Sequence, residues 1–308
     1  MNPWSRLAAI VAADGAAALV TVQAVAGSAP REAGARLVVQ SDGGFHGTIG
    51  GGRLEWEALA EARTALAEGR GPARRRAVAL GPDLGQCCGG RATLLIETFD
   101  ARDLADLGRL AGTSDDLACR LDGAGRVFRA TGATEPGGWR ELQPPEPTPL
   151  LLFGAGHVGR AVVLALAPLP FAVRWIDSRA DAFPAHVPAN AIAVRAPAPE
   201  AEVAGAPPGA LMLVMTHAHP IDLAVTAAAL ARPDLFVGLI GSATKRARFT
   251  RRFRSLGLPE ARIGELACPV GLPALADKAP AVIAAGIAVQ ALTVREARMR
   301  DAAMGRAA

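Results

Sequence analysis

The sequence predicts an α/β protein with two domains, an N-terminal α/β domain built on a mixed sheet and a C-terminal domain built on a doubly wound parallel sheet. Three observations support this class. The chain has 308 residues, of which 51% are hydrophobic and 20% charged, so it can bury two cores. In its second half, strand-length apolar runs alternate with helical segments, as in parallel sheets covered on both faces. A glycine-rich turn follows the first of those runs.

The first domain is expected at residues 1–105. Apolar periodicity predicts strands at 17–25, 35–40, 45–49, 76–80 and 92–99, and a helix at 54–68. Asp42-Gly-Gly44, between two apolar runs, predicts a hairpin turn. The helix directs one stripe of side chains toward the core, made of Leu54, Ala58, Ala62 and Leu66.

A variable segment and linker are expected at 106–147. Patterning is weak from 101 to 138, and residues 143–149 read Gln-Pro-Pro-Glu-Pro-Thr-Pro. Such a proline-rich run favours a stiff, extended connector. The second domain is therefore expected at 148–308.

The second domain alternates strands and helices. Strands are expected at 150–153, 172–176, 211–215 and 236–240, and helices at 160–167, 221–231 and 244–256. The apolar stretch between Lys278 and Arg295 is 16 residues long, shorter than the ~20 residues that cross a bilayer. We therefore expect a buried helix there and no membrane association.

Charge and aromatic content narrow the class of partner. The chain has 33 basic and 29 acidic residues, a net charge of +4, which admits an anionic ligand but is too mild to indicate nucleic acid. It has no Tyr and 4% aromatic residues, which disfavours a protein that stacks bases. The basic run 245–254 includes Phe249 and Phe253, which with Leu256 predict a helix with one apolar face and solvated arginines.

Cysteine usage indicates a cytoplasmic protein. Two of the four cysteines, Cys87 and Cys88, are adjacent and so unsuited to a secreted disulfide framework. The apolar run at 7–13 is interrupted by Asp14, and the next apolar run reads as a strand, so no signal peptide is expected.

A glycine turn opens the second domain. Gly154-Ala-Gly156-His-Val-Gly159 lies between a strand and a helix, the context of a Rossmann-like phosphate-binding turn. The helix N-terminus supplies amide donors, and Asp177, 23 residues after Gly154, stands where a carboxylate binds ribose. The alternative is that the turn serves folding alone.

Two histidines follow the strand at 211–215. His217, His219 and Asp222 lie at the carboxyl end of a parallel strand, where ligands collect in such sheets. A polar site that contacts a ligand and a set of structural hydrogen bonds are both consistent with this pattern. We expect no metal site, because the remaining histidines are His46, His157 and His186 alone.

The loop at 81–90 carries Cys87 and Cys88 beside glycines, where a ligand can approach the backbone. A deprotonated thiol there would act as a nucleophile or a soft ligand; the alternative is that both thiols are inert. Cys119 and Cys268 lack this setting and are expected to be structural.

Gly50, Gly51 and Gly52 precede the first-domain helix. They predict a second backbone cradle for an anion, with Arg31 and Arg53 in reach. The competing interpretation is a flexible hairpin end.

Taken in order, these segments resemble the xanthine dehydrogenase accessory proteins of the XdhC type, grouped with the CoxI proteins of molybdenum enzyme maturation. The resemblance rests on Gly27-Ser-Ala-Pro-Arg31, Gly50-Gly-Gly-Arg-Leu-Glu55, Gln86-Cys-Cys-Gly-Gly90, Gly154-Ala-Gly-His-Val-Gly159, Thr216-His-Ala-His-Pro-Ile-Asp222 and Gly238-Leu-Ile-Gly-Ser-Ala-Thr-Lys-Arg246. Cys268-Pro-Val-Gly-Leu272 is similar to the family's Cys-Pro-Ile-Gly element, whereas 273–280 departs from its usual continuation.

The resemblance implies a binding and delivery protein rather than an enzyme. Family members hold molybdenum cofactor (molybdopterin) and protect it while a cysteine desulfurase replaces a molybdenum oxo group by sulfur. They then insert it into the molybdenum-binding subunit of xanthine dehydrogenase, in purine catabolism. Cys88 matches the family's Cys-Gly-Gly and is the thiol expected nearest the cofactor, with Cys87 second. The resemblance leaves open which domain holds the cofactor. We also expect a homo-oligomer.

The alternative from a different class is an NAD(P)-dependent oxidoreductase. It would bind the dinucleotide with the 154–159 turn and Asp177, and His217 or His219 would serve as the acid-base group because the chain has no Tyr. A metal-dependent hydrolase built on His217, His219 and Asp222 would lack ligands.

Overall fold

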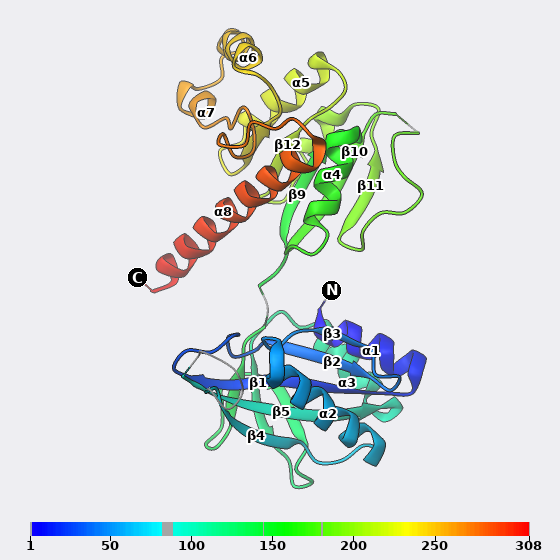
Figure 1. The fold of residues 1–308 in the computed structure, drawn as a ribbon. Coiled ribbons are helices and arrows are strands. Elements are labelled where there is room, and N and C mark those ends of the chain that lie inside the picture. The colour runs from blue at the N-terminus through cyan, green and yellow to red at the C-terminus, as the bar shows by residue number, and fades with distance from the viewer. Residues whose placement is uncertain (1, 82–88, 144, 180, 308) are drawn as a thin grey trace. The chain divides into compact units, whose positions relative to one another are not determined.

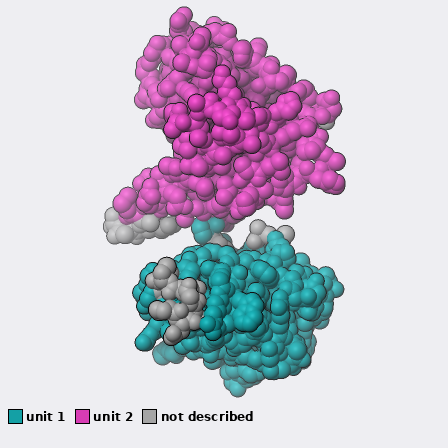
Figure 2. Space-filling model, in the orientation of Figure 1, with its two compact units in different colours: residues 1–145 teal, residues 146–308 magenta. Residues whose placement is uncertain are grey.

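The computed structural model describes residues 2–81, 89–143, 145–179 and 181–307. The chain forms two compact units, Met1–Pro145 and Glu146–Ala308, drawn in different colours in Figure 2. The boundary between them lies in the proline-rich segment.

The N-terminal unit is built on a five-stranded sheet of order β3-β2-β1-β5-β4 (Figure 1). Its elements are α1 (Pro3–Asp14), β1 (Ala16–Ala26), β2 (Arg36–Gln40), β3 (Phe45–Gly47), α2 (Gly52–Glu68), β4 (Arg74–Ala79), β5 (Arg91–Asp100), η2 (Ala101–Asp103) and α3 (Leu104–Ala111). Every pairing among these described strands is antiparallel, which corrects the expectation of a mixed sheet. Short connections such as the turn at Asp42 join neighbouring strands, and these permit only antiparallel pairing.

Both faces of this sheet are covered. Along β1, Ala18 and Val20 face the cluster that includes α2, whereas Ala17 and Leu19 face α1 and α3. The alternation follows from the two-residue period of a strand. The sequence did not predict α1, which starts at the Asn2 cap with Pro3 in its first turn.

A second sheet lies in the segment expected to be variable. It consists of β6 (Leu117–Leu121), β7 (Val127–Thr131) and β8 (Trp139–Glu141), in the order β7-β6-β8. Arg129 is buried and joins this sheet to β5, because its guanidinium donates to Glu97 Oε1 at 3.0 Å and through Nε to Glu141 Oε2 at 3.0 Å. Arg36 Nη2 donates to the same Glu141 oxygen at 2.9 Å. A buried ionic network therefore ties the small sheet to the main one.

The C-terminal unit is a doubly wound parallel sheet of order β11-β10-β9-β12-β13, as predicted. Its elements are β9 (Thr148–Phe153), α4 (His157–Leu166), β10 (Phe171–Asp177), β11 (Ala191–Arg195), η3 (Pro199–Val203), β12 (Leu211–Val214), α5 (His219–Leu230), β13 (Phe236–Leu239), α6 (Ala243–Ser255), α7 (Glu260–Gly264) and α8 (Pro280–Ala307). The chain winds outward from β9 to β11 and returns to β12 on the other side of β9. The switch point between β9 and β12 is where such sheets bind ligands.

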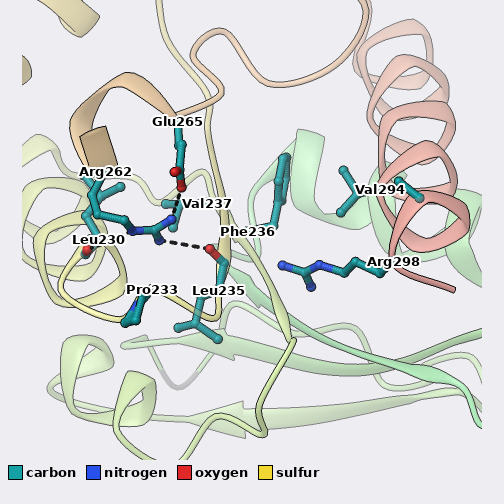
Figure 3. Close-up of a pocket in the computed structure, with 10 residues that line it drawn as sticks. Leu230, Pro233, Leu235, Phe236, Val237, Arg262, Glu265, Val294 and Arg298 are labelled. Atoms are coloured by element: carbon teal, nitrogen blue, oxygen red, sulfur yellow. Dashed lines mark hydrogen bonds and ion pairs between the residues drawn. The ribbon is translucent and has the colours of Figure 1, made fainter. Parts of the chain in front are cut away.

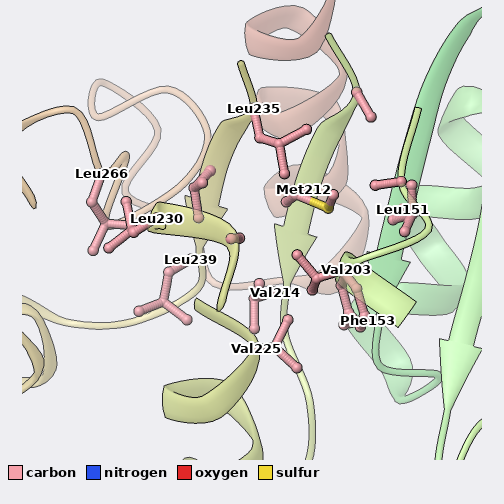
Figure 4. Close-up of a cluster of buried hydrophobic side chains, with 14 of the residues drawn as sticks. Leu151, Phe153, Val203, Met212, Val214, Val225, Leu230, Leu235, Leu239 and Leu266 are labelled. Carbon is pink, nitrogen blue, oxygen red and sulfur yellow. The ribbon is translucent and has the colours of Figure 1, made fainter. Parts of the chain in front are cut away.

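The strands of this sheet are buried on both faces. Figure 4 shows Phe153, Met212 and Val214 packed with Val225 of α5 on one face. The opposite face packs Leu152 and its neighbours against α4 and α8. Continuous apolar runs were the sequence signal for this arrangement.

Helix α8 is longer than the 16 residues expected, running from Pro280 to Ala307. Ala284, Ile287, Ala288 and Ala291 form its buried face, which packs in the same cluster as α4. Within the described residues α8 is the helix long and apolar enough to span a bilayer, a property that core helices share.

Candidate functional sites

Three loops of the N-terminal unit that are far apart in sequence are in contact at one end of the main sheet. A Cβ atom at Gly90 would lie 2.2 Å from the Ser28 carbonyl oxygen, and one at Gly50 would lie 2.5 Å from Pro30 Cβ. Segments 27–31, 48–52 and 89–90, here called the glycine-loop cluster, therefore pack closely and depend on glycine. Cys87 and Cys88, the expected thiols, lie outside the described residues.

The expected anion cradle at Gly50–Gly52 already holds a carboxylate of the chain itself. Glu55 Oε2 accepts from Thr48 Oγ1 at 2.6 Å, from the Ile49 amide at 2.9 Å and from the Gly51 amide at 3.3 Å. Glu55 lies in the first turn of α2, where a negative charge is favoured by the helix dipole. An external anion at these amides would compete with Glu55.

Both arginines predicted near this cradle have carboxylate partners. Arg31 Nη2 pairs with Glu32 at 2.8 Å, and the Arg31 hydrogen bond lowers the pKa of Glu32 to about 2. Arg31 Nη1 also lies 3.4 Å from the Thr48 carbonyl oxygen, which keeps this guanidinium beside the cluster. Arg53 Nε pairs with Glu57 at 2.7 Å.

The three glycines of the C-terminal turn have different structural roles. Gly154 has φ +116°, and a Cβ there would lie 2.2 Å from the Met215 carbonyl oxygen. A Cβ at Gly159 would lie 2.0 Å from the Gly154 carbonyl oxygen, so this residue lets α4 pack on β9. At Gly156 no atom of the described structure lies within 4 Å of the Cβ position. The space at Gly156, at the uncapped N-terminus of α4, is open to a ligand.

Asp177 ends β10 as predicted, but its carboxylate is used within the protein. The oxygens accept from the Ala155 amide at 2.7 Å, from the Arg179 amide at 3.0 Å and from the Arg179 guanidinium at 2.9 and 3.0 Å. Although burial opposes ionisation, these donors lower the pKa of Asp177 to about 2. Four hydrogen bonds fill its acceptor capacity, and the half-exposed Arg179 presents a cation instead.

The segment after β12 forms an ionic cluster that the sequence did not predict. Asp222 is buried; its Oδ1 accepts from Thr216 N at 2.9 Å and from Thr216 Oγ1 at 2.7 Å, and its Oδ2 lies 2.5 Å from Lys245 Nζ. His219 begins α5, where its Nδ1 lies 3.1 Å from Arg248 Nη2, and His217 lines the adjoining cavity. The available sequence signal was Lys245 at the start of a helix directly after a strand and a glycine.

No group of three or more His, Cys, Asp or Glu side chains that could hold a metal occurs among the described residues. Asp222 is engaged by Thr216 and Lys245. What His217, His219 and Asp222 share is one cavity, which all three line.

The two described cysteines are buried in the cores. Burial raises the pKa of the Cys119 thiol to about 12 and also raises the pKa of Cys268. Both thiols therefore stay protonated and unreactive, in line with the structural role expected for them.

A further cavity of about 390 Å³ lies where α7 and α8 approach the start of β13 (Figure 3). Arg262 Nη2 donates to the carbonyl oxygens of Arg232 at 2.8 Å and Leu235 at 3.0 Å, while Arg298 donates to Gly209. The guanidinium groups of Arg262 and Arg298 thus donate to loop carbonyl groups at the end of the sheet opposite the glycine turn, which is a structural role.

Comparison with known proteins adds three findings. A family model described as the XdhC Rossmann domain matches residues 150–291, and one described as the XdhC and CoxI family matches residues 10–76. The uncharacterized protein YqeB of Escherichia coli (strain K12) is 26% identical over 279 residues, which are 87% of this chain and 42% of that protein. The chain thus spans less than half of this curated relative. A crystal structure of a xanthine dehydrogenase from Bacillus halodurans has a TM-score of 0.75 at 22% identity, covers 97% of both chains and shares the fold.

Proposed function

The chain belongs to the XdhC and CoxI family, and on this basis we propose that it serves the maturation of xanthine dehydrogenase as a molybdenum cofactor-binding chaperone. It protects the cofactor during sulfuration by a cysteine desulfurase and inserts it into the molybdenum-binding subunit. It acts as a carrier and not as an enzyme, in the cytoplasm, as a homo-oligomer.

The observation that carries this proposal is the glycine-loop cluster. Segments 27–31, 48–52 and 89–90 belong to three of the motifs that resemble the family, and they converge although up to 63 residues separate them along the chain. Convergence of separate motifs at one surface favours a shared ligand, because packing alone does not require exposed loops to meet. Cys88, directly before Gly89, is proposed as the thiol nearest the molybdenum, with Cys87 second.

The charges near the cluster suit a phosphorylated pterin. Arg31 lies beside it and its side chain is 37% exposed, so it can exchange Glu32 for a ligand phosphate. In the C-terminal unit, the space at Gly156 offers a second place for an anion, with His217 and His219 further along the same sheet edge. Variants in each unit are needed to decide which of the two units holds the cofactor.

The deciding experiment measures cargo and delivery. The protein is purified from hosts with and without molybdenum cofactor synthesis, its pterin and molybdenum contents are determined, and it is added to cofactor-free xanthine dehydrogenase. We expect bound pterin only from the competent host and a gain of dehydrogenase activity. Arg31→Gln should weaken cofactor retention, whereas Arg102→Gln, an exposed arginine that pairs with Asp100 after the end of β5, serves as the charge-matched control. Protein free of pterin from a competent host would refute the proposal.

The 154–159 turn supports one alternative, an NAD(P)-dependent oxidoreductase. The hydrogen bonds of Asp177 argue against this function, because its carboxylate must release Arg179 before it can accept hydrogen bonds from ribose hydroxyls. Titration with NADH and NADPH, followed by fluorescence, distinguishes this oxidoreductase from the proposed chaperone. Micromolar binding together with oxidation of a substrate would favour the oxidoreductase.

A further inference from the structure

A cavity of about 480 Å³ lies at the carboxyl ends of β12 and β13, between the N-termini of α5 and α6. Its lining is rich in hydrogen-bond donors and includes His217, His219, Ser242, Lys245 and Arg248. The volume falls within the range of small-molecule sites. The cavity lies at the carboxyl-end edge of the sheet, next to the switch point between β9 and β12 where doubly wound folds place ligands.

Lys245 is held in a fixed position at the floor of this cavity. Its Nζ donates to Asp222 Oδ2 at 2.5 Å and to the Ile240 carbonyl oxygen at 2.9 Å, and its side chain is 11% exposed. An ammonium has three donors, so one N–H remains for a ligand. The charge is thus placed before any ligand arrives.

Gly241 makes this placement sterically feasible. A Cβ atom there would lie 2.7 Å from Lys245 Cδ, so any other residue would push the lysine stem away. The lysine folds back over the start of its own helix, toward the end of β13. Lys245 Nζ therefore lies at the N-terminal end of α6, where the helix dipole also favours a bound anion.

Arg248 and His219 complete the donor set. Because a guanidinium can only donate, His219 Nδ1 accepts from Arg248 Nη2 in their 3.1 Å contact. The ring proton then resides on Nε2, which is a donor. The charged side chains that line the cavity are two cations, Lys245 and Arg248, and one anion, Asp222. Asp222 is buried and accepts a hydrogen bond from Thr216. The positive ends of α5 and α6 add to this balance.

We propose that this cavity binds the phosphate group of a small phosphate monoester through Lys245, Arg248 and the Ser242 hydroxyl. The cavity is larger than a phosphate group alone, so it admits the rest of a small ligand. Arginine and lysine side chains acting together bind planar and tetrahedral oxyanions. This inference does not depend on molybdenum cofactor being the cargo.

Isothermal titration of the full chain with inorganic phosphate and with ribose 5-phosphate tests it. Ribose 5-phosphate should bind, and more tightly than inorganic phosphate, and Arg248→Gln should raise its dissociation constant about tenfold, the value of one charge-assisted hydrogen bond. Arg251→Gln is the matched control, since Arg251 lies on α6 but does not line this cavity. Because Lys245→Met alone would leave the Asp222 carboxylate buried and unpaired, the lysine is tested as Lys245→Met with Asp222→Asn, with circular dichroism to verify folding.

Three results would overturn the proposal. The first is no measurable binding of ribose 5-phosphate, or binding no tighter than that of inorganic phosphate. The second is an equal loss in Arg248→Gln and Arg251→Gln, which would indicate attraction by net charge. The third is a loss in Gly156→Val with none in Arg248→Gln, which would place the phosphate at the 154–159 turn instead.

Discussion

The three glycines of the turn in the C-terminal unit face different surroundings, so substitutions at each should have different effects. Gly156→Val places a side chain where no described atom lies within 4 Å of the Cβ, at φ −75° and ψ −171°, a conformation open to any residue. Gly159→Ala and Gly154→Ala instead place a Cβ 2.0 and 2.2 Å from backbone carbonyl oxygens. The first variant should lose ligand, and the other two should lose stability.

The magnitudes follow from these contacts. At the N-cap, a β-branched residue costs about 1 kcal/mol relative to glycine, and reduced freedom of the unfolded chain returns about 0.4–1 kcal/mol. The free energy of unfolding of Gly156→Val should therefore lie within about 0.5 kcal/mol of the parent. For Gly159→Ala, overlap costs about 1–3 kcal/mol against a helix propensity gain of about 1 kcal/mol. For Gly154→Ala, the left-handed φ adds about 1–3 kcal/mol to a similar overlap.

Urea unfolding of the three variants measures these differences. Trp175 reports on the turn, because its indole Nε1 donates to the Gly154 carbonyl oxygen at 3.0 Å. With a slope of about 2 kcal/mol per molar urea, Gly154→Ala should shift the midpoint by about 1–3 M, and Gly156→Val by less than about 0.3 M. Titration of folded Gly156→Val with NAD, NADP and molybdenum cofactor then tests the open space. A destabilised Gly156→Val, or a Gly154→Ala as stable as the parent, would refute the steric assignment.

Three further predictions concern charge and thiol chemistry. Arg129→Met should lower the free energy of unfolding by about 3–5 kcal/mol, measured by urea denaturation, because it leaves the buried Glu97 carboxylate without its partner and Glu141 with Arg36 alone. The lowered pKa of Asp177 contributes stability that is present above pH ~4 and is lost as pH falls toward 2, worth about 2 kcal/mol; the acid limb of Asp177→Asn should be flatter, and identical limbs would contradict this. Cys88→Ala should reduce molybdenum retention whereas Cys119→Ala, which removes a buried thiol, should not; equal retention in both would exclude a role for Cys88.

Local pattern in the sequence determined much of the fold. Continuous apolar runs that alternate with helices predicted the parallel sheet, and Gly154-Ala-Gly156-His-Val-Gly159 predicted its first turn. These features are readable because strand and helix periods, and the need for glycine at tight turns, act within a few residues. The weakly patterned segment 106–147 gave no such signal. Its small sheet depends on Arg129 meeting Glu97 and Glu141, and buried ion pairs leave no periodic trace.

The state of the candidate sites was decided only by tertiary structure. Sequence placed Gly51 and Asp177 correctly at a helix start and a strand end, but not the groups that contact them. The Glu55 carboxylate accepts from the Gly51 amide, and the Arg179 guanidinium pairs with Asp177. Lys245 donates to Asp222, which lies 23 residues earlier in the chain. A donor or acceptor is free only when no neighbour in space satisfies it. The chain's fold sets those neighbours, because burial makes every unsatisfied polar group costly and so pairs residues that are distant in sequence.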